Sequence, residues 1–126
     1  MPTGADAPHL PNPAPIEAYG NGGFRFGGMS HRGSLLCFPD GIWAWPVQGL
    51  AELSETTLAQ AFARAAALDF FLIGAGEDPW VLPEPLRGRF RDLSLSVDTM
   101  ATGAAVRTYN ILLAENRRVG AGLIAV

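Results

Sequence analysis

The eleven residues DFFLIGAGEDP, positions 69–79, carry the clearest structural signal in this chain. Their apolar run does not alternate with polar residues, which indicates a short strand buried on both faces of a sheet. Gly74 and Gly76 follow where that strand should end. Ligands of open α/β sheets bind outside the carboxyl ends of the strands, so these glycines stand where either a phosphate site or a simple turn is expected.

A structural turn is the better interpretation of the two glycines. Phosphate binding needs a helix N-terminus directly behind the loop, with free amides and no local negative charge. Here Glu77 and Asp78 follow at once, and the next helix is predicted to begin only near Pro83. The chain also has neither the spaced glycines of a dinucleotide site nor the Lys-Ser/Thr pair of a phosphate loop.

The segments after this strand alternate between helical and extended patterns. Such an order predicts parallel strands joined by right-handed crossovers, with helices covering the sheet. The predicted elements are a helix over residues 82–93, a strand over 94–98, the longest helix over 99–119 and a final strand over 120–126.

The segments before it change from extended to helical. Short strands are predicted over residues 16–20 and 24–26, then a hairpin of apolar runs that meet at Asp40-Gly41. Residues 53–68 predict an amphipathic helix of about four turns, with Ser54 as its N-cap, because apolar residues recur at three- and four-residue steps. The chain is therefore predicted to be an α/β protein with an antiparallel N-terminal portion.

The N-terminal segment differs in composition from the rest. Five of the ten prolines lie within the first fifteen residues, which excludes a helix or a central strand there. We predict a flexible or extended Pro-rich arm over residues 1–15 and a single domain over residues 16–126.

Composition excludes several classes of function. A net charge of −3 gives no general attraction to nucleic acid or to anionic membranes. A single cysteine, Cys37, excludes an internal disulfide, and no apolar run approaches the ~20 residues of a membrane span. The N-terminus resembles neither a secretion signal nor a mitochondrial transit peptide, so we expect a cytoplasmic protein.

Two groups near the long helix are candidates for chemistry. Asp98, with Thr99 and Thr102, is either a carboxylate base at a pocket mouth or part of a helix cap, and we favour the cap. Arg107 either binds an anion or forms an ion pair with Asp98 or Glu77, and we favour the ion pair.

The remaining reactive or aromatic residues give weaker signals. His9 lies in the arm and His31 in a predicted turn, so no contact between them is assumed and no metal site is expected. Cys37 is expected to be a small buried hydrophobe, and a Cys37–His31 nucleophile pair is the lesser alternative. Trp43 and Trp45 share one face of a strand, and whether that face is core or a partner-binding patch stays open.

Three blocks of the chain together resemble a known family. They are GGFRFGG…HRGSLL…P.GIWAWPV, FFLIGAGEDPWVLPEPLR and SVDTMATGAAVRTYNILLAENRRVGAGLIAV. In this order they are similar to the Mth938-like domain family, the DUF498 type of formerly unknown function. That family includes the mitochondrial respiratory complex I assembly factor 3 proteins and many bacterial and archaeal homologues. The resemblance runs from about Ile16 to Val126.

The resemblance implies a three-layer single-domain α/β fold with a mixed central sheet. It implies no established catalytic mechanism and no cofactor; the mitochondrial members are assembly factors that bind a sister factor and nascent complex I subunits. Since this chain lacks a targeting segment, we expect a bacterial relative, peripheral to the inner membrane through its partners. The motif residues that carry over as a candidate ligand or partner site are Gly74, Gly76, Asp98, Thr102, Arg107, Tyr109 and Asn110, to which the loop adds Glu77.

Two hypotheses on function follow. The favoured one is a non-enzymatic interaction protein that binds protein partners and assists the assembly of a respiratory or other membrane-associated complex. The alternative is a small-molecule or anion-binding protein, or an enzyme, whose site combines Gly74–Glu77, Asp98, Thr102 and Arg107 at the carboxyl edge of the parallel strands. The oligomeric state is left open.

Overall fold

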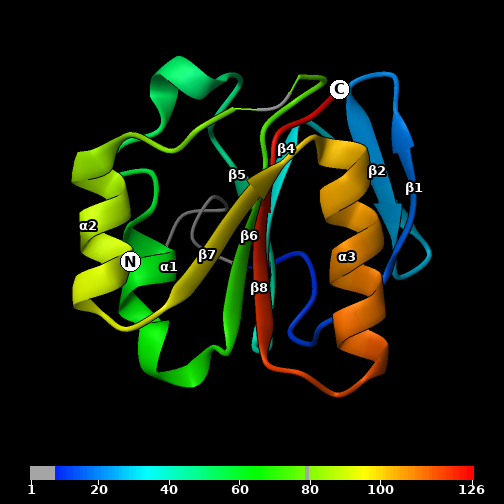
Figure 1. Cartoon of the computed structure of the whole chain (residues 1–126). Coiled ribbons are helices and arrows are strands. Elements are labelled where there is room, and N and C mark those ends of the chain that lie inside the picture. Colours follow the sequence, from blue (N-terminus) through cyan, green and yellow to red (C-terminus); the bar gives the residue numbers. More distant parts are fainter. Residues whose placement is uncertain (1–7, 79) are drawn as a thin grey trace, which may run out of the picture.

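The fold has three layers, seen edge-on in a computed structural model that describes residues 8–78 and 80–126 (Figure 1). A five-stranded sheet forms the middle layer. Two helices, α1 and α2, cover one face, whereas α3 and a separate three-stranded sheet cover the other (Figure 1). The predicted three-layer α/β architecture is therefore confirmed.

The strands are four or five residues long; the strand predicted over residues 16–20 forms as predicted, whereas the one predicted over 94–98 lies two residues later. The strands are β1 (Ile16–Gly20), β2 (Gly23–Phe26), β3 (Met29–Arg32), β4 (Ser34–Phe38), β5 (Gly41–Trp45), β6 (Phe70–Gly74), β7 (Ser96–Met100) and β8 (Val119–Leu123). The helices are α1 (Ala59–Ala63), α2 (Glu84–Asp92) and α3 (Thr102–Ala114), with 3₁₀ turns η1 (Leu50–Glu52) and η2 (Ala65–Ala67).

The central sheet is mixed, with strand order β5-β4-β8-β6-β7. β6 pairs in parallel with both β7 and β8, so the C-terminal half forms the predicted β-α-β-α-β arrangement. β4 pairs antiparallel with β8 and, through the Pro39-Asp40 turn, with β5. The second sheet has the order β1-β2-β3, and its strand β3 was not predicted, because the glycines around His31 indicate a turn.

Residues 8–15 of the Pro-rich segment lie against the domain. Leu10 forms an antiparallel bridge with Ile42 on β5, the edge strand of the central sheet. Leu10 and Ala14 also pack against buried side chains on the α3 side. Residues 1–7, the first part of the predicted arm, lie outside the described residues.

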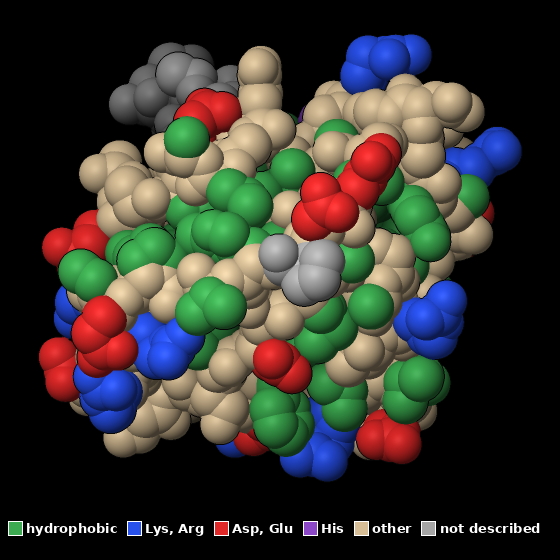
Figure 2. Space-filling model, turned by 45° about the horizontal axis from the view of Figure 1, so that its top comes forward, with side chains coloured by type: hydrophobic (Ala, Val, Ile, Leu, Met, Phe, Trp, Pro, Cys, Tyr) green, Lys and Arg blue, Asp and Glu red, His purple; other side chains and the backbone are tan. Residues whose placement is uncertain are grey.

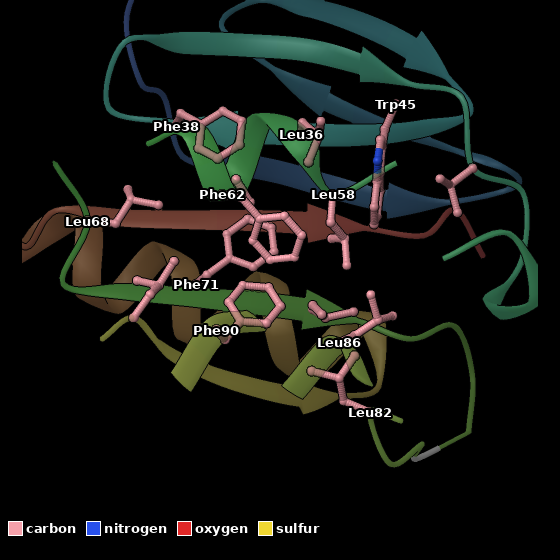
Figure 3. Close-up of a cluster of buried hydrophobic side chains, with 14 of the residues drawn as sticks. Leu36, Phe38, Trp45, Leu58, Phe62, Leu68, Phe71, Leu82, Leu86 and Phe90 are labelled. Atoms are coloured by element: carbon pink, nitrogen blue, oxygen red, sulfur yellow. The ribbon is translucent and has the colours of Figure 1, made fainter. Parts of the chain in front are cut away.

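Aromatic rings dominate the core between the central sheet and the α1/α2 layer (Figure 3). The rings of Phe38 and Phe71 are stacked, as are those of Phe71 and Phe90, with centroids 6.0 and 5.8 Å apart. Trp43 and Trp45 are buried in the same cluster. This settles the question about the tryptophans: their shared face belongs to the core.

Two glycines in β8 make room for these rings. A methyl group on Gly122 would lie 2.7 Å from Cη2 of the Trp45 indole, and one on Gly120 would lie 3.0 Å from both Phe38 and Phe71. Contacts under about 3 Å force the core to move, because protein interiors are close-packed. The strand at the centre of the sheet therefore has to lack side chains where the aromatic layer crosses it.

The predicted four-turn helix over residues 53–68 is wrong in length. Ser54 does accept a hydrogen bond from the Thr57 N–H (3.2 Å), as predicted for a cap, but α1 covers only Ala59–Ala63. The indole of Trp45 donates to the Thr57 carbonyl (2.8 Å), and the Ala61 N–H donates to Leu58 instead. A tertiary hydrogen bond thus replaces a helical one at the point where the first turns were expected.

The predicted extent of the long helix is also wrong. α3 ends at Ala114, so Arg117 and Arg118 lie beyond its last turn. Both arginines instead face Asp69 just before β6, with an Arg118–Asp69 ion pair of 2.8 Å. Among the helices of residues 8–78 and 80–126, none combines the length and the apolar character needed to cross a membrane.

Replacing Gly122 by alanine should destabilise the protein by about 1–3 kcal/mol, because the new methyl group collides with Trp45. Chemical denaturation followed by tryptophan fluorescence measures the change. The matched control is Gly49→Ala: its backbone is extended and its added methyl meets no atom within 4 Å. Equal stabilities for the two variants would contradict the packing argument.

Candidate functional site

Thr102 closes the glycine loop at the carboxyl end of β6. Its side-chain oxygen accepts a hydrogen bond from the Gly76 N–H (2.9 Å) and donates one to the Ile124 carbonyl (2.7 Å). Its own N–H donates to the Gly76 carbonyl (2.8 Å). Thr102 is fully buried, so these bonds are made out of contact with water. One side chain therefore joins the loop after β6, the start of α3 and the residues after β8.

Both loop glycines are needed for this contact between the loop and Thr102. Gly76 has a φ of +96°, a conformation that L side chains rarely adopt. A methyl group on Gly74 would lie 3.1 Å from the Thr102 Cα, so the strand can approach the helix only without a side chain. The Gly76 amide that a phosphate would need is already bonded to Thr102. These contacts support the interpretation of the loop as a structural turn.

Glu77 and Asp78 follow the loop with exposed side chains. They lie on the side of the molecule where β6 and β7 end, which is turned forward in Figure 2. Hydrophobic side chains gather on this face beside acidic ones (Figure 2), and Val81 is one of the large apolar residues that are mostly exposed.

Asp98 and Thr99 do not cap α3, so the favoured cap hypothesis is wrong for them. Both belong to β7, whose pairing with β6 continues to Met100. The N-cap position is Ala101, which offers no side-chain hydrogen bond, and the Thr99 hydroxyl donates to the Trp80 carbonyl (2.6 Å). Asp98 is exposed and lines a hollow of about 240 Å³ along β6 and β7.

Arg107 lies in a different hollow. A groove of about 380 Å³ between β1 and α3 is lined by Arg107 together with Tyr19, Glu17 and Gly103. Arg107 is exposed, and within residues 8–78 and 80–126 no carboxylate lies within ion-pair distance of it. The predicted ion pair with Asp98 or Glu77 is therefore wrong, because Arg107 projects from α3 on the β1 side.

Tyr19 contributes to this groove although it was not among the predicted site residues. It is 45 % exposed, and its hydroxyl lies so close to α3 that a methyl group on Gly103 would collide with it. The pairing of β1 with β2 shifts register between Ile16 and Ala18. Simple alternation along the strand therefore could not have indicated which way Tyr19 points.

Asn110 and Tyr109 fasten the N-terminal segment to α3. The Asn110 side chain accepts from the Ile16 N–H (2.8 Å) and donates to the Ile16 carbonyl (2.9 Å), as a neighbouring strand would. The buried Tyr109 hydroxyl donates to the Ala14 carbonyl (3.3 Å). In this structure, both polar side chains bond to backbone.

Burial suppresses ionisation of the reactive groups in this region. Desolvation raises the pKa of the fully buried Cys37 thiol to about 12, and it also raises the pKa of the Tyr109 hydroxyl. A thiol that stays protonated at neutral pH is a poor nucleophile. Cys37 is fully buried in the core, so it is the buried hydrophobe that was favoured, and the Cys37–His31 alternative lacks support.

His9 and His31, for which no contact was assumed, lie side by side. Nε2 of His9 is 3.1 Å from Nδ1 of His31. Their separation of 22 residues and the unpredicted strand β3 hid this contact from sequence reasoning. In the described part of the chain, no three His, Cys, Asp or Glu residues are grouped as ligands for a metal.

The predicted site residues therefore do not all lie at one place in the structure. Thr102 contacts the loop glycines, and Arg107 and Asn110 line the groove between β1 and α3, whereas Asp98 lines the other hollow. Whether any of these residues binds a ligand or a partner stays a prediction.

Replacing Thr102 by valine should cost about 1–3 kcal/mol for each buried backbone group left without its partner. Thr102→Ser keeps the hydroxyl and should cost only about 0.8 kcal/mol for the lost methyl. Urea denaturation of both variants measures the difference. A serine variant as unstable as the valine variant would show that packing, not hydrogen bonding, holds the loop.

Replacing Asn110 by alanine should loosen β1 by about 2 kcal/mol, since two hydrogen bonds to Ile16 are lost. Hydrogen exchange should accelerate at the Ile16 amide while the Leu72 amide in β6 stays protected. Ile111→Ala, a change at the exposed next position of α3, is the control. Unchanged exchange at Ile16 in the Asn110 variant would contradict the proposed attachment.

The sequence of this chain is similar to a protein family and to individual known proteins. Residues 16–124 match the family model described as protein of unknown function (DUF498/DUF598). An uncharacterized protein of Rhodobacter capsulatus is 38 % identical over 110 residues, which are 87 % of this chain and 83 % of the relative. Assembly factor 3 of the NADH dehydrogenase [ubiquinone] 1 alpha subcomplex, from Drosophila melanogaster, is 28 % identical over 112 residues, which are 86 % of this chain but only 57 % of the fly protein.

Solved structures show the same fold. A crystal structure described as that of an outer membrane protein from Bartonella henselae has a TM-score of 0.89 at 47 % identity, covering 94 % of this chain and 99 % of that one. A Mth938-like domain from Bordetella pertussis has a TM-score of 0.77 at 27 % identity, covering 98 % and 92 %. The chain therefore belongs to the DUF498/DUF598 family and has the Mth938-like fold.

Proposed function

We propose that this chain is a non-catalytic interaction protein that assists the assembly of a membrane-associated complex, with respiratory complex I as the leading case. One observation carries the proposal: the polar motif residues Thr102, Tyr109 and Asn110 all bond to backbone groups of the chain itself. Such residues stabilise the fold rather than face a substrate. The name of the Drosophila relative, a complex I assembly factor, supports the same conclusion.

The partner is a protein that binds in the groove between β1 and α3. Tyr19 and Arg107 are exposed there, and both residue types are enriched among the residues that dominate binding energy at protein interfaces. Arg107 lacks an ion pair within the described residues, so a carboxylate on the partner can supply one at no cost to the fold. The fitting occupant is a segment of an assembly partner that places one carboxylate against Arg107 and no negative charge beside Glu17.

The location that goes with this function is the bacterial cytoplasm, with association to the inner membrane through the partners. The alternative, a small-molecule site or enzyme at the strand ends, has less support. It requires Asp98, Arg107 and the loop after β6 to share one hollow, but Asp98 and Arg107 line different ones.

Deleting the gene in the native organism should lower the amount of fully assembled complex I on native gels and the NADH–quinone reductase activity of the membranes. Normal levels of complex I and of other inserted membrane complexes would contradict the proposal.

Complementation then tests the groove. The wild-type gene should restore assembly, whereas Arg107→Glu should not, because the reversed charge repels the partner's carboxylate. Arg87→Glu, on α2 at the opposite side of the molecule, is the matched control and should restore assembly. Rescue by Arg107→Glu would exclude the groove as the binding surface.

A further inference from the structure

The His9–His31 pair has features of a metal-binding pair. His9 comes from the N-terminal segment and His31 from β3, and the two ring nitrogens that face each other are 3.1 Å apart. Two imidazoles that share one metal ion at bond lengths of about 2.0–2.1 Å bring their nitrogens to roughly this separation. His9 is exposed and His31 partly exposed, so an ion can enter from solvent.

A backbone contact orients His31 for this role. Nε2 of His31 lies 3.2 Å from the Ser34 carbonyl oxygen, which can only accept a hydrogen bond. A neutral His31 therefore carries its proton on Nε2 and turns the Nδ1 lone pair toward His9. Histidines that bind metals commonly donate their other N–H to a carbonyl or carboxylate in this way.

The two rings make a bent hydrogen-bond contact, and the same inclination suits two ligands of one ion. The ring centres are 4.7 Å apart, and the ring planes are inclined by 51°. A head-on N–H···N contact of 3.1 Å would hold the ring centres farther apart, since each nitrogen would then lie on the line that joins them. Two ligands of one ion are inclined, because the ion lies beside the line between their nitrogens.

We propose that His9 and His31 form a two-imidazole site for a divalent transition metal that imidazole favours, Cu²⁺, Ni²⁺ or Zn²⁺. The described residues supply no further His, Cys, Asp or Glu ligand, so water completes the coordination and the ion exchanges readily. This inference is independent of the assembly role.

The bound ion holds the N-terminal segment on the edge of the central sheet. The His9 N–H donates to the Ile42 carbonyl (2.7 Å), and the Ile42 N–H donates to the Leu10 carbonyl (3.0 Å). Ile42 belongs to β5, whose outer edge these bonds cover. An uncovered edge strand is a template for pairing with other chains, and an ion bound to both histidines strengthens the cover that these backbone bonds already form.

Calorimetric titration of the full-length, tag-free protein with ZnCl₂ or NiCl₂ at neutral pH tests the site. We expect saturable one-to-one binding that His9→Ala and His31→Ala each weaken by about tenfold or more. Asn12→Ala, a change of an exposed residue in the same segment, should bind as the wild type does. Absence of saturable binding, or binding that survives either histidine substitution, would overturn the proposal.

Hydrogen exchange is a second test, and it remains informative if a histidine substitution destabilises the protein. Zn²⁺ should slow exchange at the Ile42 amide in the wild type and leave it unchanged in His9→Ala. Protection of the β6 amides shows whether the His9→Ala variant is folded. Equal slowing in both proteins would show that the ion acts elsewhere and would overturn the site.

Discussion

The hydroxyl of Thr102 is the contact on which the carboxyl edge of the sheet depends. It joins the loop after β6, the first turn of α3 and the residues after β8, three segments that have no local reason to meet. Because Thr102 is fully buried, each of these bonds would leave an unsatisfied backbone group if the hydroxyl were lost. The glycines beside it follow from this closure: Gly74 permits the close approach of α3, and Gly76 supplies the positive φ.

The middle of the sheet depends on a second constraint, the absence of side chains at two positions of β8. Gly120 and Gly122 let the rings of Phe38, Phe71 and Trp45 lie directly over the strand. The packing of these aromatic rings therefore requires glycine at both positions of β8. The Trp45 indole also takes the Thr57 carbonyl from the helix expected over residues 53–68, so the packing of this ring bears on where α1 begins.

These constraints bear on function because they explain why most of the polar residues in the family motif are present. Thr102, Tyr109 and Asn110 stabilise the fold, whereas Tyr19 and Arg107 stay exposed in the groove beside α3. A family motif that is largely structural leaves recognition to the surface around it. A distant relative is named as a complex I assembly factor, and this division is compatible with the assembly role proposed above.

The sequence by itself determined most element types, the hairpin at Asp40, the parallel C-terminal order and the family, but not strand β3. Periodicity and turn chemistry are local, and the family motifs can be read directly from the chain. Only the tertiary structure decided which polar groups meet: Asn110 with Ile16, His9 with His31, and Arg107 with no carboxylate of the described residues. These outcomes join or separate residues far apart in the chain, and in a mixed sheet with long connections no local pattern specifies such pairs. The positions of these residues relative to one another follow from the strand order and the side-chain packing.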